Sequence, residues 1–209
     1  MEVKIYVEGP NDLEFLGVYL QEILDFVADD NPRDKLHLFT KGETRVELIN
    51  LGGYTNLNRA IIQEDIREDL EDEIQSLVIL DADTNANDGG FGVRKTQVEA
   101  IQATVPFECF LMPNGAGDGD LETLLRNILV DEYQVALECF RNFNQCLEEA
   151  NKQLQGTKFK GADEKTTLYK VFLGRLKNTG QNKFKDQTIW NLNHPYLDPL
   201  KTFLQTQLH

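Results

Sequence analysis

Three acidic residues follow two apolar segments of the chain. Glu8 comes directly after Val3–Val7, and Asp81 and Asp83 come at the end of Ser76–Leu80. Both segments are largely aliphatic or β-branched, which is typical of buried parallel strands. Ligands of open α/β sheets bind just beyond the carboxyl ends of the strands, so neighbouring strands would bring the three carboxylates together. Converging carboxylates repel one another unless a cation lies between them, and oxygen ligands favour Mg²⁺ or Mn²⁺. The pattern therefore indicates metal-assisted phosphate chemistry.

The pair Asp81-x-Asp83 has a second interpretation. An acid after a strand is also common as a helix N-cap or a loop residue, and one Asp-x-Asp pair is weak evidence for a metal. The occurrence of Glu8-Gly9 at an equivalent strand end is what favours the metal site. Mg²⁺ usually keeps several waters and takes only one or two carboxylates, which suits such a pair.

The elements that position these acids follow from the spacing of apolar residues. Strands alternate with helices, which implies a mostly parallel sheet with right-handed crossovers. We expect the first helix to be capped by Asn11, with Glu14 as its capping-box partner. A short edge strand is expected at 36–39. The main strands are expected at 3–7, 46–49, 76–80 and 107–112. The fold class is thus α/β, a Rossmann-like four-stranded sheet flanked by helices.

The strand pattern stops near residue 130. Beyond it the sequence predicts helices over 131–154, 164–177 and 195–208, joined by a polar connector at 178–193. We therefore expect an α/β core over residues 1–130 and a helical C-terminal extension over 131–209 that packs on the core.

The charge of the chain is divided unevenly. The net charge over 209 residues is −14, which at first argues against nucleic acid as a partner, since phosphate binding depends on Lys and Arg. Residues 151–209, however, carry 10 basic and 4 acidic side chains, and the first 150 residues carry 11 basic and 31 acidic ones. Such asymmetry indicates either a surface for a polyanion or a solvated helical face beside an acidic neighbour. The candidate nucleic-acid contacts are Lys158, Lys160, Lys165, Lys170, Arg175 and Lys177.

The cysteines and the hydropathy bear on location. Cys109, Cys139 and Cys146 are odd in number and form no Cys-x-x-Cys pair, so we expect reduced, structural thiols in a cytoplasmic protein. Cys139 and Cys146, one heptad apart on an expected helix, are assigned to packing rather than to metal. No apolar stretch approaches the roughly 20 residues that span a bilayer. The chain enters a strand at once, so neither a signal peptide nor a membrane partner is expected.

The order of these motifs resembles the TOPRIM domain. The motif Val7-Glu8-Gly9-x-x-Asp12 and the later strand ending in Asp81-x-Asp83 are similar to those of primases, type IA and II topoisomerases, OLD-family nucleases and the ribonuclease that matures 5S ribosomal RNA. This resemblance covers residues 1 to about 130. The whole chain resembles a family of small stand-alone TOPRIM-related proteins of unknown function, through Asp118–Glu122 and the ending His194–Leu204.

The resemblance implies roles for individual residues. It makes Glu8 a general acid/base or metal-facing carboxylate and makes Asp81 and Asp83 ligands of Mg²⁺ or Mn²⁺. Asp12 matches an acidic position on the first helical turn of several TOPRIM nucleases and primases. A second cation would lie at Asp120 or Glu122, although acids in the first turn of a helix also favour its dipole.

Two functional hypotheses remain open at this point. The first is a Mg²⁺-dependent nuclease that grips nucleic acid with its basic C-terminal region. The second is a non-catalytic binding module that acts with a partner such as an ATPase, which the resemblance to OLD systems implies. Primase or topoisomerase activity is not expected, because the chain is short and has no tyrosine in a nucleophile motif. The loop after Asp83 contains no Lys or Arg before Arg94-Lys95, so a cation for a phosphoryl group is not evident beside the acids.

Overall fold

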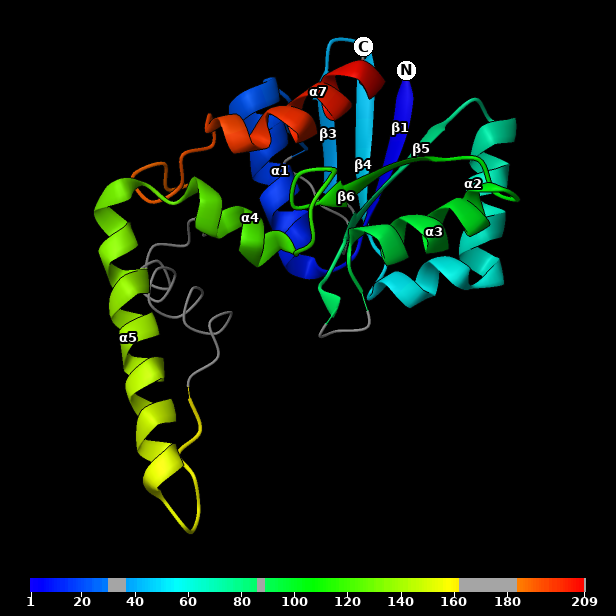
Figure 1. Cartoon of the computed structure of the whole chain (residues 1–209). Helices are drawn as coiled ribbons and strands as arrows, with labels where there is room; N and C mark the ends of the chain where they lie inside the picture. The colour runs from blue at the N-terminus through cyan, green and yellow to red at the C-terminus, as the bar shows by residue number, and fades with distance from the viewer. Residues whose placement is uncertain (30–36, 86–88, 162–183, 209) are drawn as a thin grey trace. The chain divides into compact units, whose positions relative to one another are not determined.

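The chain forms two compact units in the computed structural model, which describes residues 1–29, 37–85, 89–161 and 184–208 (Figure 1). The first unit comprises Met1–Asn127 and Leu192–His209, and the second comprises Ile128–Asn191. The sequence predicts one boundary near residue 130, whereas the structure has a second one, at which the chain returns to the first unit. The final helix therefore belongs to the same unit as the sheet.

The first unit is built on a mixed sheet, which has six strands among the residues that are described. The strand order is β2-β3-β4-β1-β5-β6. β1 is parallel to β4 and β5, and β6 is parallel to β5, whereas β3 is antiparallel to β4 and β2 to β3. The strand bounds are β1 Glu2–Val7, β2 Val27–Ala28, β3 His37–Lys41, β4 Thr44–Asn50, β5 Gln75–Asp81 and β6 Glu108–Met112.

The α/β class predicted from the sequence is confirmed, but the sheet is wider than the four strands expected. The four main strands expected correspond to β1, β4, β5 and β6, and the short edge strand expected at 36–39 corresponds to β3, which forms an antiparallel hairpin with β4; β2 was not predicted. Gly42 in the tight connection between β3 and β4 has φ +58°, a conformation that glycine adopts at no steric cost and that suits a two-residue hairpin turn. The short β2 then pairs with β3.

Helices cover both faces of this sheet. The helices of the first unit are α1 Pro10–Leu24, η1 Tyr54–Asn58, α2 Ala60–Glu71, α3 Phe91–Gln102, α4 Leu121–Ile128, η5 Pro195–Leu197 and α7 Asp198–Gln207. Side chains alternate across a strand, so Tyr6 and Val78 point to one face while Ile5 and Phe110 point to the other. α2 and α3 lie on the Tyr6 face. α7 lies on the opposite face, where the Phe203 and Phe110 rings are 5.4 Å apart.

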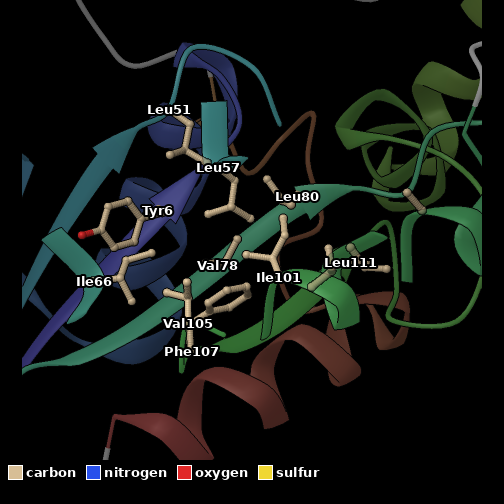
Figure 2. Packing of buried hydrophobic residues seen from close by; sticks show 12 residues of the cluster. Tyr6, Leu51, Leu57, Ile66, Val78, Leu80, Ile101, Val105, Phe107 and Leu111 are labelled. Carbon is tan, nitrogen blue, oxygen red and sulfur yellow. The ribbon is translucent and has the colours of Figure 1, made fainter. Parts of the chain in front are cut away.

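The core between the sheet and α2 and α3 consists of aliphatic side chains together with the rings of Tyr6 and Phe107 (Figure 2). Ile66 of α2 and Ile101 of α3 pack against strand residues Val78 and Leu80, and all four are buried. At about 25 cal/mol per Å² of apolar surface removed from water, such contacts are the main stabilising contribution of the fold. This rigid core sets the position of the strand ends at which the acids lie.

A buried polar cluster also joins α2 to the sheet. The Asp69 carboxylate, 4% exposed, forms an ion pair with the Lys4 ammonium of β1. It also accepts hydrogen bonds from the Tyr6 hydroxyl at 3.1 Å and the Ser76 hydroxyl at 3.3 Å. Burial, reinforced by the Asp69 charge, raises the pKa of Tyr6 above its usual range, so the phenol keeps its proton and donates.

The second unit contains the helix α5, Asp131–Gln153. The first and last residues of this unit lie next to each other. Leu129 and Trp190 form an antiparallel bridge, and the Asn191 N–H donates to the Ile128 carbonyl at 2.7 Å. Cys139 and Cys146 lie on α5 but are exposed, so the expectation that they pack in a core is wrong. The helix predicted over 164–177 lies outside the described residues. No helix in the described ranges is long and apolar enough to cross a membrane.

Candidate functional site: an acid cluster at the carboxyl ends of the strands

Glu8 and Asp81 meet at the ends of two adjacent parallel strands. β1 and β5 pair through Val7 and Ile79, so the residues that follow leave the sheet side by side. The Glu8 carboxylate accepts a hydrogen bond from the Asp81 backbone N–H at 3.4 Å. Asp81 in turn accepts one from the Leu121 N–H at 3.1 Å, which connects it to the start of α4. The strand ends thus bring acids far apart in sequence into one site.

Asp83 lies in a strained turn that two loops hold in place. Its φ is +60°, which is uncommon for a residue other than glycine. The Asp83 N–H donates to the Gly119 carbonyl at 2.7 Å, and the Gly119 N–H donates back at 2.8 Å. A Cβ atom at Gly89 would lie 2.4 Å from the Asp83 Cβ. Gly89 and Gly119 therefore serve to close the loops on Asp83.

Asp12 caps the first helix and faces the cluster. α1 begins at Pro10 rather than after Asn11, so Gly9 is the N-cap and Asp12 is the third helical residue. The Asp12 Oδ2 accepts the Gly9 N–H at 2.8 Å. Its other oxygen, Oδ1, is buried and has no hydrogen-bond partner among the described residues. A buried polar atom without a partner is costly, and such atoms often mark the place of a bound water or ion.

The acids at the start of α4 complete the cluster and also have a structural role. The Asp120 Oδ1 accepts from both the N–H and the hydroxyl of Thr123 at 2.8 Å, so it caps the helix. Glu122, in the first turn, is buried. Both carboxylates act electrostatically on Asp81. Asp120 thus caps α4 and, like Glu122, also lies close enough to Asp81 to belong to the acid cluster.

The pKa values of the buried acids show that they repel one another. Burial raises the pKa of Asp81 well above its usual range, and the surrounding carboxylates raise it further. Burial and the charges of Glu8 and Glu122 raise the pKa of Asp12 to about 7. Burial and the charge of Asp83 raise the pKa of Glu8. The structure therefore brings together all six predicted acids, namely Glu8, Asp12, Asp81, Asp83, Asp120 and Glu122.

The cluster has oxygen donors suited to a hard cation, but the side chains do not converge on one point. No group of three or more His, Cys, Asp or Glu within the described residues is arranged to hold a metal ion. The reason is that several carboxylate oxygens are already engaged. Asp12 and Asp120 each use one to cap a helix, and Asp83 uses one for an ion pair with Arg94. Coordination would require rotation of side chains, which carboxylates in loops and first helical turns allow.

Arg94 is a residue of the site that the sequence analysis missed. Its side chain is 2% exposed, and its Nη2 donates to the Asp83 carboxylate at 2.5 Å. Its Nε donates to the Asp81 carbonyl at 3.1 Å, and the guanidinium stacks 3.5 Å from the centre of the Tyr54 ring. Arg94 follows Asp83 by 11 positions in the sequence, so only the return of α3 to the strand end makes them neighbours. The one sign of it in the sequence is its spacing, because Arg94 lies on the same face of the helix as the buried Val98 and Ile101.

The basic residues predicted to contact nucleic acid are described only in part. Lys158 and Lys160 are exposed in the second unit. Between them, the exposed Phe159 is held by its backbone, since Asn151 accepts its N–H at 2.7 Å and donates to its carbonyl at 2.8 Å. The remaining four predicted contacts, Lys165, Lys170, Arg175 and Lys177, lie outside the described residues.

The fold and the site define an α/β protein with a partly buried acid cluster at the carboxyl ends of its parallel strands. The chain belongs to the family described as protein of unknown function DUF3226, whose model matches residues 2–209. No curated protein matches the chain.

Two solved structures are similar to the chain. One is the hypothetical protein PH0156 from Pyrococcus horikoshii OT3, at 12% identity and a TM-score of 0.55, covering 99% of this chain and 95% of that one. At this identity the likeness shows the fold alone. The other is the cytosolic domain of the T. maritima FeoB iron transporter in GMPPNP form, at 15% identity, covering 88% of this chain and 78% of that one. Its TM-score of 0.21 carries no argument about fold or function.

Proposed function

We propose that the chain is a TOPRIM-like enzyme that cleaves phosphodiester bonds of nucleic acid with the help of Mg²⁺ or Mn²⁺. The observation that carries this proposal is the acid cluster, in which carboxylates repel one another and the buried Asp12 Oδ1 has no hydrogen-bond partner within the described residues. Carboxylates placed close together away from water destabilise a protein that has no ligand. A cation among them would relieve the repulsion and would bond the Asp12 Oδ1.

The donor set fits a hard divalent cation. Asp81 and Asp83 would hold it, with Asp12 and Glu8 close by, and Asp120 or Glu122 would serve a second ion. When bound, such ions polarise a phosphoryl oxygen and lower the pKa of bound water. Carboxylates are the ligands that Mg²⁺ and Mn²⁺ prefer. Their number at the site exceeds what one Mg²⁺ takes, which leaves a carboxyl group over for proton transfer.

Glu8 is the group suited to move that proton. Burial and the negative charge of Asp83 raise the pKa of Glu8 towards neutral pH. A general acid or base works best when its pKa lies near the working pH. The Glu8 Oε2 is held by the Asp81 N–H at 3.4 Å, so the carboxyl stays at the strand end. The residue thus combines a raised pKa with a defined position.

The second unit supplies support for a nucleic-acid substrate. An aromatic ring flanked by two lysines offers one base a stacking surface and its phosphates two cations, and stacking is worth about 1–3 kcal/mol per base. Phe159, which is 59% exposed, lies between the exposed Lys158 and Lys160 in the sequence and would offer such an arrangement. The hydrogen bonds with Asn151 hold the backbone in place, which lowers the entropy lost on binding.

The test is cleavage of labelled single-stranded and structured DNA and RNA with Mg²⁺ or Mn²⁺. Asp81→Asn and Asp83→Asn should each lower the rate by at least about 100-fold, which is the usual cost of losing one preorganised charge. Asp72→Asn is the matched control, because Asp72 is an exposed acid at the end of α2 and should leave the rate unchanged. Wild-type protein that cleaves none of these substrates with either metal would contradict the proposal.

A binding module that acts with a partner such as an ATPase is the second candidate. It is favoured by the bonds that already occupy Asp12, Asp83 and Asp120, which give each acid a structural role. The partner class rests on the TOPRIM resemblance to OLD systems. Calorimetric titration separates the candidates: binding of Mg²⁺ or Mn²⁺ that is millimolar or weaker, and unchanged by Asp81→Asn, would favour the module.

A further inference from the structure

Arg94 is a cation enclosed within an acidic site. Its Nη2 bonds the Asp83 carboxylate at 2.5 Å and its Nε bonds the Asp81 carbonyl at 3.1 Å, so one guanidinium spans the whole Asp81-x-Asp83 turn. Its Nη1 donates to Gln97 at 3.1 Å, and Tyr54 covers its face at 3.5 Å. The Arg94 side chain is 2% exposed and each of its three nitrogens donates a hydrogen bond within the protein. Arg94 is therefore not placed to bind substrate phosphate directly.

The charge of Arg94 opposes the repulsion among the acids. The Asp83 side chain is 23% exposed, so it is more accessible than the Arg94 guanidinium with which it pairs, which is 2% exposed. The Arg94 charge also favours the ionised form of Glu8. In a site of low dielectric, one positive charge so placed has a large effect on any further cation that approaches.

We propose that Arg94 is a positioning residue that acts as a built-in counter-cation, so that its ion pair with Asp83 and the binding of a divalent cation at the acid site oppose each other. The inference rests on the proposed function, because it concerns the same metal. In the metal-free protein the ion pair holds Asp83 on the α3 side of the site. A divalent cation must then draw Asp83 away from Arg94 and tolerate the nearby positive charge.

The opposition follows from linkage. Two cations that share one carboxylate lower each other's affinity by the same factor, and such coupling usually amounts to about 5- to 150-fold. A residue with a purely structural role would show no such factor, since its removal would destabilise the metal-free and metal-bound proteins equally. Metal affinity is therefore the quantity that distinguishes the two roles.

The experiment is calorimetric titration of the full chain with Mn²⁺ after removal of metal with a chelator. Arg94→Met removes the charge and keeps an apolar stem against Tyr54, whereas Arg94→Lys keeps the charge. Lys95→Met is the matched control, since Lys95 is the next residue of α3 and its side chain is 57% exposed; within the described residues its one ion pair is with Glu99, at 3.8 Å. Asp81→Asn identifies the heat that comes from the acid site.

Arg94→Met should bind Mn²⁺ at least about fivefold more tightly than the wild type, while Arg94→Lys and Lys95→Met should stay within about twofold. Equal or weaker binding by Arg94→Met, with the wild type binding normally, would overturn the role of Arg94 and leave the proposed function intact. No binding by the wild type itself would count against both.

The proposal remains testable if Arg94→Met does not fold without metal. Circular dichroism would then follow refolding as Mn²⁺ is added. Recovery of the native spectrum with Mn²⁺ and not with K⁺ would support the proposal, because the divalent ion replaces the lost charge. A variant that stays unfolded at saturating Mn²⁺ would overturn it, because Arg94 would then be needed for folding irrespective of the metal.

Discussion

Replacing Asp12 by Asn tests the electrostatics of the acid site directly. Burial and the carboxylates of Glu8 and Glu122 raise the pKa of Asp12 from 3.8 to about 7. An Asn side chain retains the oxygen that accepts the Gly9 N–H at 2.8 Å but carries no charge. Asp12→Asn should therefore keep the cap of α1 and remove the repulsion.

The size of the effect depends on pH, and its sign follows from the direction of the pKa shift. Because the folded state holds the proton more tightly than the unfolded state, the contribution of Asp12 to stability is complete below about pH 4 and is lost as pH rises to about 7. The loss is about 1.4 kcal/mol for each pH unit in that window. The Asn variant has no such loss. Its free energy of unfolding, relative to wild type, should thus rise by about 2 kcal/mol between pH 5.5 and pH 8 and stay constant above pH 8.

Urea denaturation followed by far-ultraviolet circular dichroism measures this difference, with a chelator present to remove metal. A pH of 5.5 keeps the protein away from its isoelectric point near 4.6. Asp131→Asn is the matched control, because Asp131 is an exposed acid in the first turn of α5, and its effect should be within about 0.5 kcal/mol at both pH values. A stability difference between Asp12→Asn and wild type that is the same at both pH values would refute the reasoning.

Two further predictions concern elements that position the site. Asp69→Ala should lower the free energy of unfolding by about 2–4 kcal/mol, because it leaves the partly buried Lys4 and the buried Tyr6 hydroxyl without their acceptor; urea denaturation measures this, and a loss below 1 kcal/mol would show that α2 does not depend on the cluster. Gly119→Ala should cost about 2 kcal/mol or more, because Gly119 has φ +138° and the new Cβ would lie 2.7 Å from the Thr123 hydroxyl; a thermal midpoint equal to that of wild type would contradict the close approach.

The strand ends that carry Glu8 and Asp81 follow from the sequence because the apolar runs before them are short and rich in β-branched residues, which favours buried strands over helices. Local rules were less dependable where two signals competed. Asn11 is a good N-cap by residue type, but Pro10 is preorganised for the first helical position, so the helix begins earlier and Gly9 is its cap. Asp12 thereby becomes the capping acid as well as a member of the cluster.

The rest of the site depends on contacts between residues far apart in the chain. The bridge between Asp83 and Gly119 joins two polar loops that have no pattern of their own. The burial of Arg94 depends on three partners from other elements, each of which satisfies one part of a charged group that would otherwise be excluded from the interior. Hydrophobic periodicity contains no information on such pairings. The roles of these residues in binding metal or nucleic acid stay predictions until the experiments above are done.

The position of α7 in the first unit has a consequence for the newly made chain. Phe203, whose ring packs on Phe110 of β6, follows that residue by 93 positions in the sequence. At about 5–20 residues per second, the ribosome needs roughly 5–20 s to make this stretch. During that time the strand that presents Phe110 has been synthesised and the helix that shields it has not. The nascent protein thus exposes apolar surface of the sheet around Phe110 while the second unit is translated, and exposed apolar surface of this kind makes a partly folded chain prone to aggregation.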